Sequence, residues 1–234
     1  MPYYYWDPTY ILVLIGALLS VGASALVNRT FNHYSSVYAR SGLTGAQAAQ
    51  KLLHSQGIYD VQIQHISGSL TDHYDPRNKT LSLSDAVYNA TTVAAIGVAA
   101  HECGHAMQHA KGYVPLSIRS ALVPVVNFGS YLSWPLIVIG LFISSSTGSL
   151  FLNAGLLLFS LVVLFQLVTL PVEINASRRA VRLLDQEHIL IGDEVGQTAR
   201  VLKAAALTYV ASAAASILQL LRLLILTGGR RRDD

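Results

Sequence analysis

The stretch His101-Glu102-Cys103-Gly104-His105 decides the fold of this chain, and the eight residues before it, 93–100, are all apolar or glycine. Such a run predicts a buried helix, in which residues four positions apart lie on one face. His101 and His105 can therefore offer imidazole nitrogens to one metal ion. In a chain of 234 residues with 8 His and 4 Glu, a match to the pattern HExxH would arise by chance only about 0.005 times. The motif thus indicates a site rather than two solvated histidines.

The donor types in this motif favour zinc. Two neutral imidazole nitrogens suit Zn²⁺, and a catalytic zinc site needs one more protein ligand and a water molecule. Glu102 is rotated away from the metal axis, so its carboxylate can reach that water as a general base. Zinc lowers the pKa of such a water to roughly 7, which predicts attack on a carbonyl group. Cys103 lies about 200° around the helix from His101 and is expected to pack as a small apolar residue.

The composition is that of a membrane protein. Hydrophobic residues make up 52% of the chain and charged residues 12%, against about 25% charged in soluble domains. A net charge of +3 gives no case for nucleic-acid binding.

Four stretches predict membrane helices, each of which needs about 20 apolar residues. The predicted segments are about 9–27, 120–143, 150–171 and 206–227. Residues 120–172 contain no Asp, Glu, Lys or Arg and are interrupted by the serine-rich stretch 144–149, which predicts a helical hairpin. Residues 23–25 resemble a signal-peptidase site, but no Lys or Arg precedes them, so a retained anchor is expected.

The polar segment before the motif predicts a helix and a small β element. Residues 44–47 fit a capping box that opens a helix over 45–56, and Gly57 closes it. Residues 61–64 and 80–84 alternate in the manner of strands. We expect residues 81–84 to be a strand edge that holds an extended peptide by main-chain hydrogen bonds; the alternative is an ordinary hairpin.

The third metal ligand must come from a segment that returns to the side of the motif. The first charged residue after the hairpin is Glu173, which we expect at the start of a helix just after Pro171. Ser177 follows one turn later and is placed to hydrogen-bond a ligand. His109 is a poor third ligand, because a straight helix separates it from His101 by about 12 Å. The other candidate donors are Asp185, Glu187, His188, Asp193 and Glu194.

Three motifs resemble the YugP family of bacterial, membrane-bound neutral zinc metallopeptidases. They are residues 101–108 (HECGHAMQ), 170–177 (LPVEINAS) and, upstream, 70–76 (LTDHYDP). The resemblance implies a gluzincin-like site with His101, His105 and Glu173 as zinc ligands and Glu102 as base. The chain is more distantly similar to the HtpX and CAAX-protease families, which place an Asp where this chain has Ser177.

The sequence therefore predicts a mainly α, polytopic membrane protein of about four membrane helices with a small α+β zincin-like catalytic portion. Residues 1–234 are expected to form a single membrane-integrated domain, with catalytic segments 28–119 and 172–205. Its predicted activity is that of a zinc metalloendopeptidase with one zinc ion, acting on membrane-associated or unfolded proteins. Two alternatives stay open: a non-catalytic scaffold or chaperone with a structural zinc site, and a zinc hydrolase of non-peptide esters or amides.

The location and partners follow from the charges and the apolar segments. Most Lys and Arg near the predicted membrane ends belong to the catalytic segments, which favours a multi-pass cell-membrane protein with a cytoplasmic active site. The arginines at 230–232 oppose this orientation if the last segment spans the bilayer. The expected partners are the lipid bilayer and a peptide or protein substrate, with no nucleic acid. A regulatory membrane partner or a homo-oligomer is left open.

Overall fold

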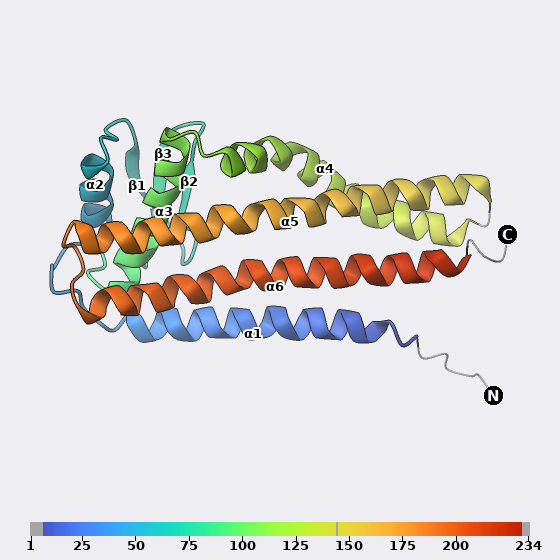
Figure 1. Ribbon diagram of the computed structural model, residues 1–234, viewed down its shortest axis with the longest axis horizontal. Coiled ribbons are helices and arrows are strands. Elements are labelled where there is room, and N and C mark those ends of the chain that lie inside the picture. Colours follow the sequence, from blue (N-terminus) through green and yellow to red (C-terminus); the bar gives the residue numbers. More distant parts are fainter. Residues whose placement is uncertain (1–6, 144, 231–234) are drawn as a thin grey trace. The chain divides into compact units, whose positions relative to one another are not determined.

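The computed structural model describes residues 7–143 and 145–230, which form six helices and one three-stranded sheet (Figure 1). The helices are α1 (Tyr10–Tyr34), α2 (Gly45–Ser55), α3 (Val93–Ala110), α4 (Val114–Phe142), α5 (Ser146–Gln186) and α6 (Asp193–Arg230), and the strands are β1 (Gln62–Ile66), β2 (His73–Asp75) and β3 (Thr80–Ser84). This confirms the predicted fold class, a mainly helical chain with a small α+β portion.

The chain divides into two compact units. The apolar unit comprises Met1–Gly22, Ile118–Thr169 and Tyr209–Asp234, and the sheet unit comprises Ala23–Ser117 and Leu170–Thr208. Whether the two act as one membrane-integrated domain, as the sequence predicts, stays a prediction.

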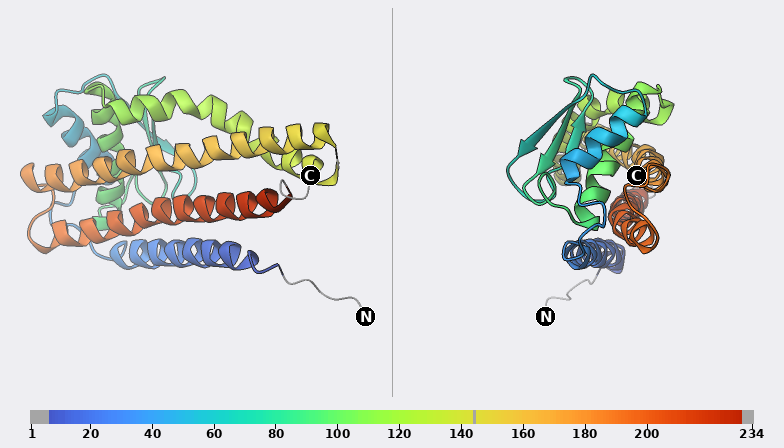
Figure 2. Two further views of the ribbon diagram at one scale, coloured as in Figure 1. Left: turned by 45° about the vertical axis from the view of Figure 1, so that its right-hand side comes forward. Right: turned by 90° about the vertical axis from the view of Figure 1, so that its left-hand side faces the viewer.

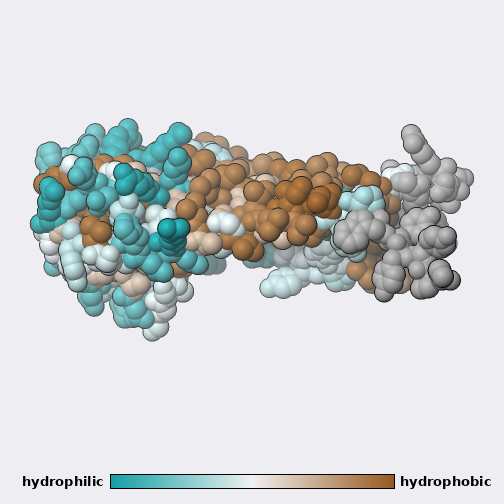
Figure 3. All heavy atoms as spheres, turned by 90° about the horizontal axis from the view of Figure 1, so that it is seen from below, coloured by the Kyte–Doolittle hydropathy of each residue, from teal (hydrophilic) through white to brown (hydrophobic). Residues whose placement is uncertain are grey.

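The apolar unit is built from parts of α1, α4, α5 and α6. By length and composition, these four helices could cross a membrane, and each overlaps one predicted membrane segment. Pro124 and Pro135 lie inside α4, and the helix bends along its length (Figure 1), as a helix does at an internal proline. In Figure 3 the visible surface of these helices is largely hydrophobic, whereas that of the sheet unit is largely hydrophilic.

Helices α4 and α5 pack closely inside the apolar unit. A Cβ on Gly155 of α5 would lie 2.9 Å from the backbone nitrogen of Ile137 in α4, so the two backbones meet at a bare glycine. Ile137, Leu152 and Phe159 form part of the buried cluster there. Large side chains such as Phe128 point outward instead, as lipid-facing residues do.

Two helix boundaries differ from the prediction. Helix α5 is continuous from Ser146 to Gln186 with Pro171 inside it, so Glu173 does not stand at a helix start as expected. Proline removes only one backbone hydrogen bond, and the other hydrogen bonds of this 41-residue helix carry it past Pro171. Helix α6 begins at Asp193, well before the predicted membrane segment 206–227, and two acidic residues in its first turn favour a helix N-terminus there.

The sheet has the order β1-β3-β2, with β1 parallel and β2 antiparallel to β3. Because β3 is the central strand, the expectation that residues 81–84 form a free edge is wrong. The hairpin alternative is confirmed, since β2 and β3 pair antiparallel with Asp75 opposite Thr80. The alternating serines misled that prediction. Ser82 and Ser84 are buried, and Ser84 is hydrogen-bonded through its N–H and hydroxyl to the carboxylate of Asp72, at 2.8 and 2.9 Å.

Helices α2 and α3 form the second layer of the sheet unit, beside the sheet (Figure 2). The predicted capping box opens α2: the Thr44 hydroxyl accepts from the Gln47 N–H, and the Gln47 amide oxygen accepts from the Thr44 N–H. The core joins both helices to the sheet and to the end of α5; it includes Leu52, Leu53, Leu81, Leu83, Ile96, Cys103 and Leu184. This packed layer holds α3, and with it the histidine motif, in a fixed place.

Candidate metal centre

Helix α3 carries the motif into the interior of the sheet unit. Thr92 caps its first turn by accepting a hydrogen bond from the N–H of Ala95, at 3.3 Å. The apolar turns that follow are buried, so the helix cannot rotate without exposing them. His105 is 8% exposed and Glu102 is also 8% exposed, which means that both polar side chains need partners inside the protein.

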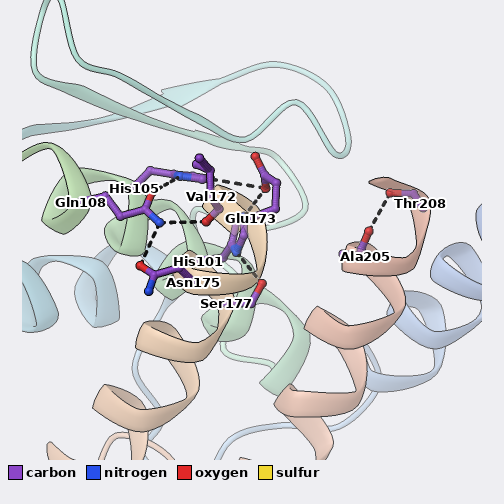
Figure 4. A network of polar contacts seen from close by, with 9 residues as sticks. All are labelled: His101, His105, Gln108, Val172, Glu173, Asn175, Ser177, Ala205 and Thr208. Carbon is purple, nitrogen blue, oxygen red and sulfur yellow. Dashed lines mark hydrogen bonds and ion pairs between the residues drawn. The ribbon is translucent and has the colours of Figure 1, made fainter. Parts of the chain in front are cut away.

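Helix α5 brings the third side chain to α3. Glu173 is 2% exposed, and its Oε2 lies 3.2 Å from Nε2 of His101 and 3.6 Å from Nε2 of His105 (Figure 4). The two imidazole rings are nearly perpendicular, with centroids 4.8 Å apart. Both rings therefore turn the same nitrogen, Nε2, toward one carboxylate.

The three donors fit a zinc ion. Zn²⁺ takes imidazole nitrogen and carboxylate oxygen at about 2.0–2.2 Å in tetrahedral geometry, which puts neighbouring donors roughly 3.4 Å apart. The donor atoms of His101, His105 and Glu173 lie within 4.8 Å of one another. Among residues 7–143 and 145–230, this is the one group of three or more His, Cys, Asp or Glu side chains able to hold an ion.

The other nitrogen of each ring has a partner of its own. Nδ1 of His101 lies 3.1 Å from the Ser177 hydroxyl, one helical turn after Glu173, as the sequence predicts. Nδ1 of His105 lies 3.1 Å from the amide oxygen of Gln108. Partners at Nδ1 orient both rings with Nε2 toward the shared point.

Sequence reasoning missed the polar side chains behind His105. Gln108 is completely buried, and its amide nitrogen donates to the carbonyl of Val172 at 2.8 Å and to the amide oxygen of Asn175 at 3.0 Å. Asn175 also accepts from Nε of Arg179 at 2.7 Å. The available signal was a glutamine three residues after a metal-type histidine, inside an otherwise apolar helix.

Charge and burial act together on the side chains of α3. Burial by itself lowers the pKa of His105, but the neighbouring carboxylates of Glu173 and Glu102 raise it above the ordinary value of 6.5. Burial and the nearby Glu102 charge raise the pKa of Cys103. That thiol stays protonated and lies 3.6 Å from the carbonyl oxygen of Ala49, in agreement with a packing role.

His109 and Glu194, two of the other candidate donors, have contacts elsewhere. His109 lies with Nδ1 2.9 Å from the Tyr74 hydroxyl of β2. Glu194 accepts from the N–H of Arg40 at 2.7 Å and from the N–H of Ile191 at 3.0 Å, so its carboxylate holds the start of α6.

The comparisons with known proteins agree with the geometry of the candidate site. Residues 9–228 match the model of a family described as "Putative neutral zinc metallopeptidase". Over 223 residues the chain is 44% identical to a protein of Bacillus subtilis (strain 168) described as "Putative membrane protease YugP", covering 94% of this chain and 98% of that protein. No solved structure matches the chain.

The family match spans nearly all of the described chain, and it confirms the resemblance found in the motifs. The name of the family implies zinc, which the donors of His101, His105 and Glu173 suit. The four long apolar helices and the relative's description as a membrane protease make this a membrane protein. The chain belongs to the neutral zinc metallopeptidase family that this description names.

Proposed function

We propose that this chain is a membrane-integral zinc endopeptidase that holds one Zn²⁺ with His101, His105 and Glu173. The observation that carries the proposal is the convergence of two imidazole Nε2 atoms on one carboxylate oxygen, at 3.2 and 3.6 Å. Catalytic zinc sites use three protein ligands and leave a position open, whereas structural sites close all four. The three-donor group in the described part of the chain favours the catalytic class over a structural scaffold.

Bound at these donors, zinc would supply Lewis acidity, which lowers the pKa of a water molecule and polarises a carbonyl group. Glu102 follows His101 on the same helix and is nearly buried. Its carboxylate is the general base of the proposal: it takes a proton from the attacking water and passes it to the leaving amine nitrogen. His101 and His105 remain fixed through their Nδ1 partners during this transfer.

The proposed substrates are peptide segments near the bilayer. Glu173 stands two residues beyond the apolar segment 150–171 of α5, so the site belongs at a membrane surface. An extended substrate can pair with a free sheet edge. Of the two edge strands, β2 is the one that contacts α3 directly through Tyr74 and His109, and we assign this role to β2 in place of β3.

Glu102→Gln tests the proposal, because it keeps the shape of the side chain and removes its basicity. We expect purified variant protein in detergent to bind one zinc per chain and to cleave casein about 10²–10⁴-fold more slowly than wild type. Asp185→Asn, an exposed acid on α5, is the control and should leave the rate unchanged. Cleavage by Glu102→Gln at the wild-type rate would refute the proposal, and turnover of small esters without casein would favour the non-peptide hydrolase.

The cytoplasmic location of the active site is part of the proposal and rests on the distribution of Lys and Arg. It can be tested in a Cys103→Ala background with Asn78→Cys in the sheet unit and Thr147→Cys in the first turn of α5, both at exposed positions. A membrane-impermeant maleimide added to intact cells should label Cys at 147 and spare Cys at 78. The reverse pattern would place the active site outside the cytoplasm.

A further inference from the structure

A chain of hydrogen bonds runs from His105 to a cation on α5. Gln108 contacts Nδ1 of His105 at 3.1 Å, Gln108 contacts Asn175 at 3.0 Å, and Asn175 contacts Nε of Arg179 at 2.7 Å. Figure 4 shows the inner part of this chain, with Gln108 lying between His105 and Asn175. The side-chain amides of Gln108 and Asn175 each have a nitrogen that donates and an oxygen that accepts. Their hydrogen-bond partners therefore show which way each amide is turned.

The cation fixes the first amide. A guanidinium group has only donors, so Nε of Arg179 must face an acceptor, and Asn175 turns its oxygen, Oδ1, toward it. The same oxygen then faces Gln108 at 3.0 Å. Gln108 must meet it with a donor, its Nε2.

A second acceptor fixes Gln108 in the same sense. The carbonyl oxygen of Val172 lies 2.8 Å from Nε2 of Gln108, and a carbonyl can only accept. With its nitrogen between two oxygens, Gln108 turns its oxygen toward His105. If Asn175 presented its amide nitrogen instead, Asn175 and Val172 would favour opposite orientations of the Gln108 amide, so the orientation depends on both acceptors. Nδ1 of His105 must therefore carry a proton to make that hydrogen bond.

We propose that Arg179 and Asn175 are positioning residues that act through Gln108 to set the tautomer of His105, with its proton on Nδ1 and a lone pair on Nε2. This inference rests on the proposed function, in which Nε2 is the zinc-binding atom. The contact of Nε2 with Glu173, at 3.6 Å, is longer than a hydrogen bond, whereas the contact of Nδ1 with Gln108 is 3.1 Å. The neutral ring is thus held ready for a metal before any metal arrives.

His101 provides an internal comparison. Its Nδ1 faces the Ser177 hydroxyl at 3.1 Å, and a hydroxyl can both donate and accept. That partner orients the ring without choosing its tautomer. Disrupting the Arg179 chain should consequently change His105 and leave His101 as it is.

The test uses full-length protein in detergent, labelled with ¹⁵N-histidine, without zinc and at a pH where the rings are neutral. In wild type, the ¹⁵N shifts of His105 should report a proton on Nδ1. Arg179→Met should move the two nitrogen shifts of His105 toward each other, and zinc affinity measured with a competing chelator should fall about 10-fold, at the lower end of the usual range for such partners. Arg178→Met, at the exposed neighbouring arginine, is the matched control and should change neither.

A rescue variant separates this role from general stabilisation. In the Arg179→Met background, Asn175→Asp supplies a carboxylate, which can present only oxygen to Gln108, and should restore both the Nδ1 proton and the zinc affinity. If Arg179→Met leaves the His105 shifts unchanged, or if Asn175→Asp fails to restore them, the proposed role of Arg179 and Asn175 is wrong even where zinc still binds. If wild type shows the His105 proton on Nδ1 but does not bind zinc, the proposed function is wrong, whereas the proposed role of Arg179 and Asn175 remains.

Discussion

Gly104 of α3 faces the backbone of Ala176 in α5, so closely that a Cβ on Gly104 would lie 2.6 Å from the carbonyl oxygen of Ala176. Real Cβ atoms do not approach a backbone oxygen to that distance. The two helices therefore meet where one has no side chain and the other has only a methyl group. Glu173 stands one turn before Ala176, so this contact sets how near its carboxylate comes to the two histidines.

Gly104→Ala should separate the two helices at the metal centre. The added methyl group meets backbone rather than a flexible side chain, and overpacking of this kind costs about 1–3 kcal/mol. We expect a lower melting temperature and a loss of zinc affinity, measured by differential scanning fluorimetry and chelator competition. Gly196→Ala is the control, because a Cβ there meets nothing within 4 Å and alanine is the better helix former. Full zinc affinity in Gly104→Ala would contradict the role of this contact.

Ser177→Ala should weaken zinc binding without removing a ligand. The change takes away the partner of His101 Nδ1 at 3.1 Å, and partners of metal-bound histidines are worth about 10–100-fold in affinity. Ser177→Asp supplies a carboxylate acceptor at the same place and should retain the affinity. An Ala variant that binds zinc as tightly as wild type would show that the hydroxyl does not orient the ring.

The convergence of His101, His105 and Glu173 could be predicted from the sequence because two simple signals point to it. Helical spacing alone puts His101 and His105 on one face. Glu173 was predicted from charge, as the first ionised residue after 53 residues without one. The helix start predicted just after Pro171 is wrong, since α5 continues through that residue. The carboxylate of Glu173 nevertheless reaches the two histidines.

The sheet and the polar chain behind His105 could not be predicted in the same way. Strand order depends on pairing between distant segments, and the alternation of β1 and of β3 is alike, so it does not tell which strand is central. The alternating serines of β3 favour an exposed face of the strand. In the structure, however, Gln64 hydrogen-bonds Ser82 and Asp72 hydrogen-bonds Ser84 in the interior. Gln108 and Asn175 lie within the stretches 101–108 and 170–177, but neither was assigned a role there, and their contacts become visible only once α3 and α5 are side by side.

The affinity for zinc should fall as the pH decreases, and the fall should begin above pH 6.5, the ordinary pKa of a histidine. The carboxylates of Glu173 and Glu102 raise the pKa of His105, and zinc must displace the added proton. In zinc-free protein, the pKa of His105 is higher in the folded than in the unfolded state, so protonation of His105 stabilises the fold. This contribution is complete below the unfolded pKa of about 6.5 and is lost as the pH rises through the folded pKa. Zinc-bound and zinc-free protein should therefore differ more in melting temperature at pH 8 than at pH 6.

The same pH series can be measured by chelator competition, which reports affinity directly. Ser177→Ala is a suitable comparison, since it weakens zinc binding while the carboxylates that raise the pKa of His105 remain. Its affinity should be lower throughout but fall over the same pH range. An affinity that stays constant from pH 8 to pH 6 would contradict proton competition at this site.

An ion pair inside the apolar unit leads to the last prediction. Nη2 of Arg222 on α6 lies 3.3 Å from the carboxylate of Asp7, and the guanidinium stacks 4.2 Å from the ring centre of Tyr10. The Arg222 side chain is 14% exposed, and a charge at such a position in a membrane helix needs a partner. The pair therefore joins the start of α1 to the far part of α6.

Asp7→Asn should destabilise the protein more than the double change Asp7→Asn with Arg222→Leu. The single variant keeps the contacts to Thr9 at the start of α1 but leaves Arg222 charged without a carboxylate, and the double variant removes that charge. Melting temperatures in detergent and in lipid vesicles measure the difference. Asp60→Asn, which breaks the exposed ion pair with Lys79 in the sheet unit, should have little effect because exposed pairs contribute little. Equal melting temperatures for the single and double variants would mean that Asp7 does not neutralise Arg222 in the folded protein.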